Sequence, residues 1–299
     1  MLEVGCGGVG MRGLLERLRA GEILVADGAT GTLLQQRGLG RGECPEEWNV
    51  SHPEVVASVA RDYAAAGSDL VYTNTFGGNR LRLAAYGLEG RVEELNRRGA
   101  EIARKAVGNE VFVVGSMGPT GEFLEPLGTH TFAEMVEIFA EQAQALAEGG
   151  VDAIVVETFS ALEEIKAAAQ GVKESTGLPL LGSMSFDPNG RTSFGVRPEQ
   201  AVAALVEAGA EVVGANCGGG PAELEPVAEK MRTANPDLLL LVKPNAGLPR
   251  LVRGEVYYPL TPAEMGEYAR RFAALGVNIL GGCCGTTPEH IAAIVQALK

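Results

Sequence analysis

Eight short apolar segments recur along the chain, and a stretch with helical spacing follows each of them. The apolar segments span residues 22–29, 70–75, 111–117, 153–158, 179–185, 212–216, 238–244 and 278–282. Most are continuous runs of Val, Ile and Leu, which is typical of strands buried on both faces of a parallel sheet. Amphipathic stretches with helix start and stop signals include 53–67, 131–149, 162–176, 198–208, 223–234 and 261–275. This alternation predicts an α/β fold, a (β/α)8 barrel of the TIM type.

The main alternative to a barrel is an open, doubly wound sheet. Such sheets usually have about five to seven strands, so this fold would leave two of the eight units unexplained. No internal domain boundary is apparent. We therefore predict a single domain over residues 13–299, preceded by an N-terminal extension at 1–12 that is expected to be disordered.

The longest irregular stretches all follow predicted strands. They cover residues 37–50, 119–131 and 248–260. In a barrel, the segments that follow strands lie at the carboxyl ends of the strands, which is where active sites are built. This end of the barrel, called the catalytic end below, is therefore expected to carry the function.

The composition excludes several classes of partner. A formal net charge of −13 argues against binding to nucleic acid or to an anionic membrane. No apolar run approaches the ~18 residues of a membrane-spanning helix, and residues 1–10 do not resemble a secretory signal. Five cysteines, an odd number, suit a reducing cytoplasm better than a disulfide framework. With three histidines in the chain, a transition metal would have to be held mainly by sulfur.

Three cysteines follow two of the predicted strands and are flanked by glycines. Cys217 follows 212–216, and the adjacent Cys283 and Cys284 follow 278–282. In a closed barrel these strand ends lie close together, with one strand between them. Three thiolates bind Zn²⁺ and leave a fourth position open, which suits the binding and alkylation of a substrate thiolate better than hydrolysis. The flanking glycines are expected to give substrate and donor access to the sulfurs.

Other interpretations of the cysteines compete with this one. A cysteine at a strand end is commonly a buried core residue, which is the interpretation favoured for Cys44. Cys283 and Cys284 could form a vicinal disulfide, and a zinc ion with four protein ligands would be structural. Cys6 lies in the N-terminal extension and is not assigned to the site.

Further polar residues at the ends of predicted strands suit an amino-acid substrate. The turn Asp27-Gly28-Ala29-Thr30 offers backbone N–H groups to a carboxylate, although an Asp at such a junction is as often a helix N-cap. Glu157 follows an apolar run and is a candidate to bind an ammonium group; the alternative is a solvated loop carboxylate. Asn245 lies at the same end. No serine-hydrolase elbow is present.

Six segments of the chain resemble the homocysteine S-methyltransferase family. They read DGATGT at 27–32, TNTF at 73–76, GSMGP at 115–119, ETF at 157–159, NCG at 216–218 and GGCCGT at 281–286. The resemblance implies a zinc-bearing (β/α)8 barrel that binds homocysteine, with Cys217, Cys283 and Cys284 as catalytic zinc ligands. It also implies that the homocysteine ammonium lies near Glu157, its carboxylate near residues 27–30, and Asn245 in the fourth zinc position before substrate binds.

Within the family, these motifs are most similar to the homocysteine-binding domain of cobalamin-dependent methionine synthase. The implied reaction is methyl transfer from methylcobalamin or a methylated corrinoid protein to homocysteine, giving methionine. A chain of 299 residues cannot also hold folate-binding and cobalamin modules. It is therefore expected to work alone with a separate corrinoid protein or beside further methionine synthase subunits. The alternatives are an enzyme that uses S-methylmethionine or betaine, and a non-catalytic thiol-binding or corrinoid-partner module.

Overall fold

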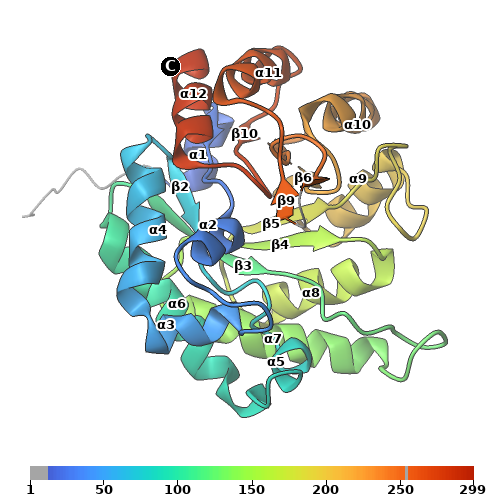
Figure 1. Cartoon of the computed structure of the whole chain (residues 1–299). Helices are drawn as coiled ribbons and strands as arrows, with labels where there is room; N and C mark the ends of the chain where they lie inside the picture. The colour runs from blue at the N-terminus through green and yellow to red at the C-terminus, as the bar shows by residue number, and fades with distance from the viewer. Residues whose placement is uncertain (1–12, 253–254) are drawn as a thin grey trace, which may run out of the picture.

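The computed structural model describes residues 13–252 and 255–299; the predicted N-terminal extension lies outside them. Eight parallel strands form a central sheet, and helices surround it (Figure 1). The strands are β1 (Leu24–Val25), β2 (Leu70–Tyr72), β3 (Phe112–Met117), β4 (Ala153–Phe159), β5 (Leu180–Met184), β6 (Val212–Asn216), β7 (Leu240–Lys243) and β10 (Ile279–Leu280). All eight predicted strands are confirmed, although β1 and β10 are shorter than expected.

The sheet closes into a barrel. Its strand order is β1-β10-β7-β6-β5-β4-β3-β2, and every pairing is parallel. The two end strands then meet through a parallel bridge between Ala26 and Leu70, and the Asp69 N–H donates to the Val25 carbonyl at 2.7 Å. This closure confirms the predicted (β/α)8 barrel and excludes the open sheet.

Most helices lie outside the barrel and connect its strands. The helices are α1 (Leu14–Arg19), α2 (Thr30–Gln36), α3 (Trp48–Ser51), α4 (Pro53–Ala65), α5 (Arg80–Ala84), α6 (Val92–Val107), α7 (Phe132–Glu148), α8 (Leu162–Ser175), α9 (Pro198–Glu207), α10 (Pro221–Ala234), α11 (Pro262–Ala274) and α12 (Pro288–Leu298), with 3₁₀ turns η1 (Pro45–Glu47) and η2 (Glu89–Arg91). Of these, α1 precedes β1 and packs Leu14 and Leu18 against the core inside the barrel, and α12 follows the last barrel strand. Thr131 and Thr261 cap α7 and α11 through reciprocal bonds with Glu134 and Glu264, as helix-start signals predict. In the described part of the chain, none of these helices has the length and apolar character needed to cross a membrane.

Alternation along the strands divides their side chains between two apolar cores. Outward-facing residues such as Val71 and Val213 pack against the helices, whereas inward-facing residues such as Leu70 and Leu241 fill the barrel. Further toward the carboxyl ends of the strands, the inward side chains become mostly polar. This inner polar layer consists of Tyr72, Ser116, Glu157, Ser183, Asn216 and Lys243. It forms the floor of the catalytic end.

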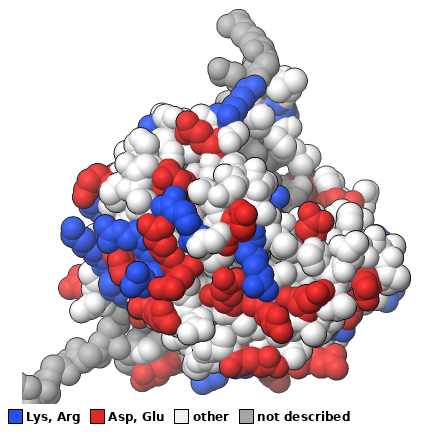
Figure 2. Space-filling model, turned by 90° about the horizontal axis from the view of Figure 1, so that it is seen from below, with Lys and Arg blue, Asp and Glu red and all other residues white. Residues whose placement is uncertain are grey.

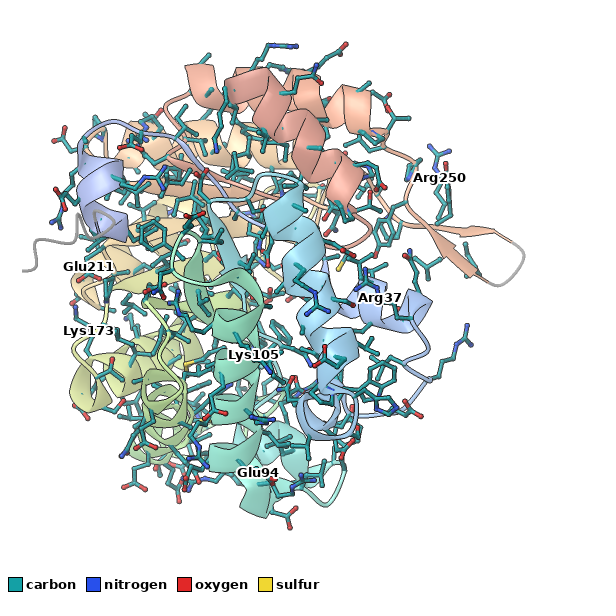
Figure 3. The ribbon with its side chains drawn as sticks, turned by 90° about the vertical axis from the view of Figure 1, so that its left-hand side faces the viewer. Arg37, Glu94, Lys105, Lys173, Glu211 and Arg250 are labelled. Carbon is teal, nitrogen blue, oxygen red and sulfur yellow. The ribbon has the colours of Figure 1, made fainter. Side chains whose placement is uncertain are left out.

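Two connections differ from the expectation of irregular loops. Residues 37–50 contain η1 and most of α3. The stretch 248–260 contains an antiparallel hairpin of β8 (Arg250–Val252) and β9 (Glu255–Tyr257). The prediction of irregular structure was wrong there, because the glycines and prolines around the stretch masked two short runs of residues with high β propensity, Leu251-Val252 and Val256-Tyr257. The hairpin projects from the barrel beside Arg250 (Figure 3).

Candidate metal and substrate site

Cys217 leaves the end of β6 through a turn with an uncommon backbone conformation. Its φ is +57° and that of Gly218 is +71°, both in the left-handed region. A non-glycine residue pays steric strain there, and such strain is concentrated at functional sites. The Cys217 N–H donates to the Lys243 carbonyl at 3.1 Å, which ties this turn to the end of β7. The turn thereby fixes the position of the first sulfur.

The loop after β10 holds the other two cysteines through backbone hydrogen bonds. The Cys283 N–H donates to the Pro244 carbonyl at 2.7 Å, and the Cys284 carbonyl accepts from the Ala246 N–H at 2.9 Å. The neighbouring glycines pack against protein: a Cβ at Gly282 would lie 2.4 Å from Thr286 Oγ1, and one at Gly285 would lie 2.2 Å from the Tyr258 ring. Gly282 also lines the cavity described below, so close packing and access to the sulfurs are compatible there, whereas Gly285 packs against Tyr258.

The three cysteines converge as predicted. Their sulfurs all lie within 4.8 Å of one another, and Cys217 Sγ lies 3.8 Å from Cys284 Sγ. Tetrahedral zinc with bonds of about 2.3 Å to sulfur requires sulfurs about 3.8 Å apart. All three thiols are free and half-buried, so the described structure contains no vicinal disulfide. The cluster therefore has the spacing and chemistry of a thiolate metal site.

Asn245 lies between the two cysteine loops. Its N–H donates to the Gly219 carbonyl at 3.0 Å, and the next residue, Ala246, donates to Cys284. Its Oδ1 is buried and has no hydrogen-bond partner among the described residues. A buried oxygen acceptor without a partner is unusual in folded proteins, and a carboxamide oxygen is a suitable ligand for a metal with an open position. The residues present thus fit a three-sulfur metal ion with a replaceable fourth ligand.

Tyr258, which sequence reasoning missed, contacts the cysteine cluster from the base of the hairpin. Its side chain hydrogen-bonds Cys284. Hydrogen bonds from Cys217, Cys283 and Tyr258 lower the pKa of Cys284 to about 3, so the cluster stabilises a thiolate at this position. Partners that hydrogen-bond metal ligands orient them and tune the metal. No motif marks Tyr258 in the sequence.

The cysteines form one side of a cavity of about 360 Å³ at the catalytic end. It is lined by Gly28, Ala29, Thr30, Gly31, Thr32, Pro45, Glu46, Tyr72, Thr73, Asn74, Thr75, Phe76, Ser116, Glu157, Thr158, Cys217, Lys243, Gly282, Cys283 and Cys284. The predicted residues Gly28, Ala29, Thr30 and Glu157 therefore share one cavity with the three sulfurs. Asp27 and Asn245 lie behind its wall. A cavity of this size suits a small amino acid.

Glu157, on β4, is held in the inner polar layer by side chains from β3 and β6. Ser116 Oγ donates to its Oε1 at 2.5 Å, and Asn216 Nδ2 donates to its Oε2 at 3.4 Å. The β4–β5 pairing is irregular between Val156 and Phe159, and such bulges re-aim side chains near active sites. Burial raises the pKa of Glu157, while Lys243 and Ser116 oppose this rise. Glu157 is thus a buried carboxylate, contrary to the solvated-loop alternative.

Asp27 forms a buried ion pair inside the barrel. Lys243 Nζ donates to its Oδ1 at 2.7 Å, and the Tyr72 N–H donates to its Oδ2 at 2.7 Å. The N-cap of α2 is Ala29, so the N-cap alternative for Asp27 was wrong. Its carboxylate supports the cavity wall through Lys243, and a direct contact with substrate stays a prediction.

Cys44 is separate from the sulfur cluster. It is buried beside Leu83, Val92 and Leu95, and its thiol donates to Glu46 Oε2 at 3.3 Å. Its core assignment is confirmed. Glu46 itself was missed by sequence reasoning: it is a buried carboxylate at the cavity wall that also accepts from the Gly77 N–H at 2.7 Å. Only the path of the 37–50 segment, which the sequence does not reveal, brings it there.

A (β/α)8 barrel with three converging cysteines in the cavity at its catalytic end defines a class of barrel proteins with a candidate thiolate metal site. A model of the family "Homocysteine S-methyltransferase" matches residues 24–298. The chain therefore belongs to the homocysteine S-methyltransferase family.

Individual relatives agree with this assignment. The chain is 36% identical to methionine synthase of Mycobacterium leprae over 306 residues, covering 95% of this chain and 25% of that protein. It is 36% identical to methionine synthase of Mycobacterium tuberculosis, with 92% and 24% covered. It thus spans about a quarter of the length of these relatives. Among solved structures, the metallated homocysteine methyltransferase MmuM from Escherichia coli superposes with a TM-score of 0.77 at 26% identity, covering 91% of this chain and 95% of that one.

Proposed function

We propose that this chain catalyses zinc-dependent methyl transfer to the thiol of homocysteine, giving methionine, with a methylcorrinoid as the methyl donor. The proposal rests on one observation: the three cysteine thiols and the buried carboxylate of Glu157 line the same cavity. One end suits a substrate thiol and the other suits an ammonium group. The substrate bound between them would be an amino acid with a thiol side chain.

The residues divide the work of binding and activation. Zinc held by Cys217, Cys283 and Cys284 would keep the homocysteine sulfur deprotonated at neutral pH and nucleophilic. Asn245 would yield its place to that sulfur. Glu157, fixed by Ser116, would hold the ammonium and so orient the sulfur toward the open mouth of the cavity. The sulfur lone pair then forms a bond to the methyl carbon, and the electron pair of the breaking bond leaves with the donor.

The distribution of exposed apolar residues supports a donor carried by another protein. Of the eleven large apolar side chains that are exposed among the described residues, ten lie between a barrel strand and the last helix that precedes the next barrel strand. These ten, here called the apolar rim, are Val50, Phe76, Tyr86, Phe123, Leu127, Phe194, Leu248, Leu251, Val256 and Tyr257. Charged side chains of both signs are interspersed with uncharged residues on the face seen in Figure 2. Concentrated apolar surface marks a contact with another molecule.

A second candidate is an enzyme that uses a small donor such as S-methylmethionine or betaine. The similarity to E. coli MmuM, which this chain covers over 95% of its length, supports it, because that homocysteine methyltransferase is a chain of similar size. Gly285 bears on the choice. The Tyr258 ring occupies the space that a larger side chain would need there, so an enzyme with a larger residue at this position would require a different site wall. A non-catalytic thiol-binding module is the third candidate.

One experiment separates these candidates. The zinc-loaded chain is incubated with homocysteine and, in turn, methylcobalamin, a methylated corrinoid protein, S-methylmethionine, S-adenosylmethionine and betaine, and methionine is measured. The proposal predicts one zinc per chain and methionine from the corrinoid donors. Methionine from S-methylmethionine or betaine alone would select the second candidate. Homocysteine binding without methionine from any donor would leave the non-catalytic module.

A further inference from the structure

Tyr72 and Lys243 form a pair in the wall of the cavity. Tyr72 ends β2 and Lys243 ends β7, and both belong to the inner polar layer, two residues beyond Leu70 and Leu241. Lys243 Nζ lies 3.5 Å from the centre of the Tyr72 ring, a cation–π contact. The hydrogen bonds to Asp27 from the Tyr72 N–H and from Lys243 Nζ hold the pair together.

The hydroxyl of Tyr72 is buried and lacks a partner. The side chain is 7% exposed, and its Oη makes no hydrogen bond to any described residue. Burial raises the pKa of this hydroxyl, and the nearby Glu157, Asp27 and Cys283 raise it further. The group is therefore a protonated donor at neutral pH. Since buried donors in folded proteins are nearly always satisfied, a donor at the wall of a substrate cavity points to a bound acceptor.

Lys243 is the one cation among the described residues that line the cavity. Its side chain is 4% exposed. An ammonium group has three N–H donors; one of them bonds Asp27 Oδ1, and the ring of Tyr72 covers another side. This leaves donor capacity toward the cavity. A buried charge of this kind is costly unless it is paired, and Lys243 is paired with Asp27 at 2.7 Å.

The ammonium and the carboxylate of an amino-acid substrate require different partners in the cavity. Its ammonium can bind the carboxylate of Glu157, which otherwise has Lys243 as its nearest opposing charge. Its carboxylate brings a third carboxylate into a cavity that is already lined by Glu46 and Glu157. Within the described lining, Lys243 is the sole group able to offset that charge.

We propose that Tyr72 and Lys243 together bind the α-carboxylate of the substrate, with the Tyr72 hydroxyl donating one hydrogen bond and the Lys243 ammonium supplying the opposing charge. The inference rests on the proposed function for the thiol end of the substrate. It deepens that function by defining the substrate class as thiols that bear a carboxylate. The turn 28–30 lines the same cavity, and its predicted contact with the carboxylate is compatible with this pair.

The test compares three ligands that share the thiol. They are homocysteine, 4-mercaptobutyrate, which lacks the ammonium, and 3-aminopropane-1-thiol, which lacks the carboxylate. Dissociation constants are measured by calorimetry on the zinc-loaded chain. Tyr72→Phe should lower the affinity for homocysteine and for 4-mercaptobutyrate by about 10-fold or more, because a hydrogen bond to a charged group is lost. The same variant should change the affinity for 3-aminopropane-1-thiol by less than about twofold.

A second variant keeps the buried charges balanced. Lys243→Met alone leaves Asp27 buried without its cation and is prone to misfold, so it is combined with Asp27→Asn. The double variant should also lose selectivity for the two carboxylate ligands. Tyr268→Phe on α11 and Lys173→Met on α8 make the same chemical changes outside the cavity lining (Lys173 is labelled in Figure 3) and should bind all three thiols normally.

The outcomes separate the inference from the function. If Tyr72→Phe weakens all three thiols equally, or none of them, the assignment of the carboxylate is overturned while thiol binding stands. If the unaltered chain binds 3-aminopropane-1-thiol as tightly as homocysteine, the carboxylate is not recognised and the inference fails. If the unaltered, zinc-loaded chain binds none of the thiols, the proposed function fails and the inference fails with it.

Discussion

The two ends of the cavity are built differently. The sulfur end consists of loop residues beyond the strands, where Cys217 and the Cys283–Cys284 pair are placed by strained or tightly bonded backbone. The opposite end consists of strand residues in the inner polar layer, including Tyr72, Glu157 and Lys243. Residue type reveals the chemistry of the first end, whereas strand register determines that of the second. Substitutions at the two ends should therefore fail in different ways.

The largest effect is expected at the sulfur end. Replacing Cys217, Cys283 or Cys284 individually by Ser should lower zinc affinity by at least about 100-fold and remove methyl transfer, because each supplies one of three ligands. Zinc content and activity are measured on the same preparation. Cys44→Ser is the matched control, since its thiol lies outside the cluster. A fully active, zinc-free variant would show that the sulfurs are not ligands.

Glu157→Gln should act at the opposite end and leave zinc in place. Because the ammonium loses its charged partner, the affinity for homocysteine should fall by about 10- to 100-fold. Because the pKa of Glu157 is raised by burial, homocysteine affinity of the unaltered chain should fall as pH is lowered toward that pKa, where the carboxylate becomes protonated and neutral.

The pH series also contains its own control. The ligand 4-mercaptobutyrate has no ammonium, so its pH profile reports proton effects on the binding of the thiol and the carboxylate without those on the ammonium. When the pH profile of 4-mercaptobutyrate affinity is subtracted from that of homocysteine affinity, a pH dependence should remain in the unaltered chain and be missing in Glu157→Gln. The same remaining dependence in both proteins would mean that another group binds the ammonium.

Tyr258→Phe should give a smaller effect on the sulfur end. It removes the hydrogen bond to Cys284 and keeps the ring that packs on Gly285. Zinc affinity, measured by competition with a chromophoric chelator, should fall by about 10-fold, the lower range for groups that orient metal ligands. Tyr257→Phe is a control one residue away on an exposed side chain. Equal zinc affinity in the two variants would remove Tyr258 from the site.

The smallest effect on the isolated chain is expected at the apolar rim. Leu251→Asp should leave zinc and homocysteine binding unchanged, because this side chain is 76% exposed on the hairpin. With a methylated corrinoid protein as donor, it should raise the KM for that protein, whereas the rate with free methylcobalamin should not change. A matched Val206→Asp, on α9 away from the rim, should affect neither. Equal effects with both donors would argue against docking at the rim.

The difference between the two ends of the cavity also explains which parts of the fold and the site could be predicted from the sequence. Continuous apolar runs predicted all eight strands, and β6 has the predicted bounds. The three cysteines were located because few residue types bind zinc and because strand ends meet in a barrel. The hairpin and the position of Glu46 depend on how long connections fold, which local patterns do not encode.

The end of the cavity formed by the inner polar layer shows a second limit of prediction from the sequence. Asp27 was visible as a polar residue after an apolar run, but its partner Lys243 is distant in sequence and looks like an ordinary strand end. The unpartnered hydroxyl of Tyr72 can be recognised only once its neighbours are known. Pairing between distant strands supplies this information, since a shift of one residue would turn these side chains to the helix face.

The central claim is that a zinc ion held by three sulfurs accepts the homocysteine sulfur as its fourth ligand. X-ray absorption spectroscopy of the zinc-loaded chain tests it directly. The account predicts three sulfur ligands and one oxygen or nitrogen ligand without substrate, and four sulfur ligands after homocysteine is added. An unchanged ligand set after addition of saturating homocysteine would contradict it.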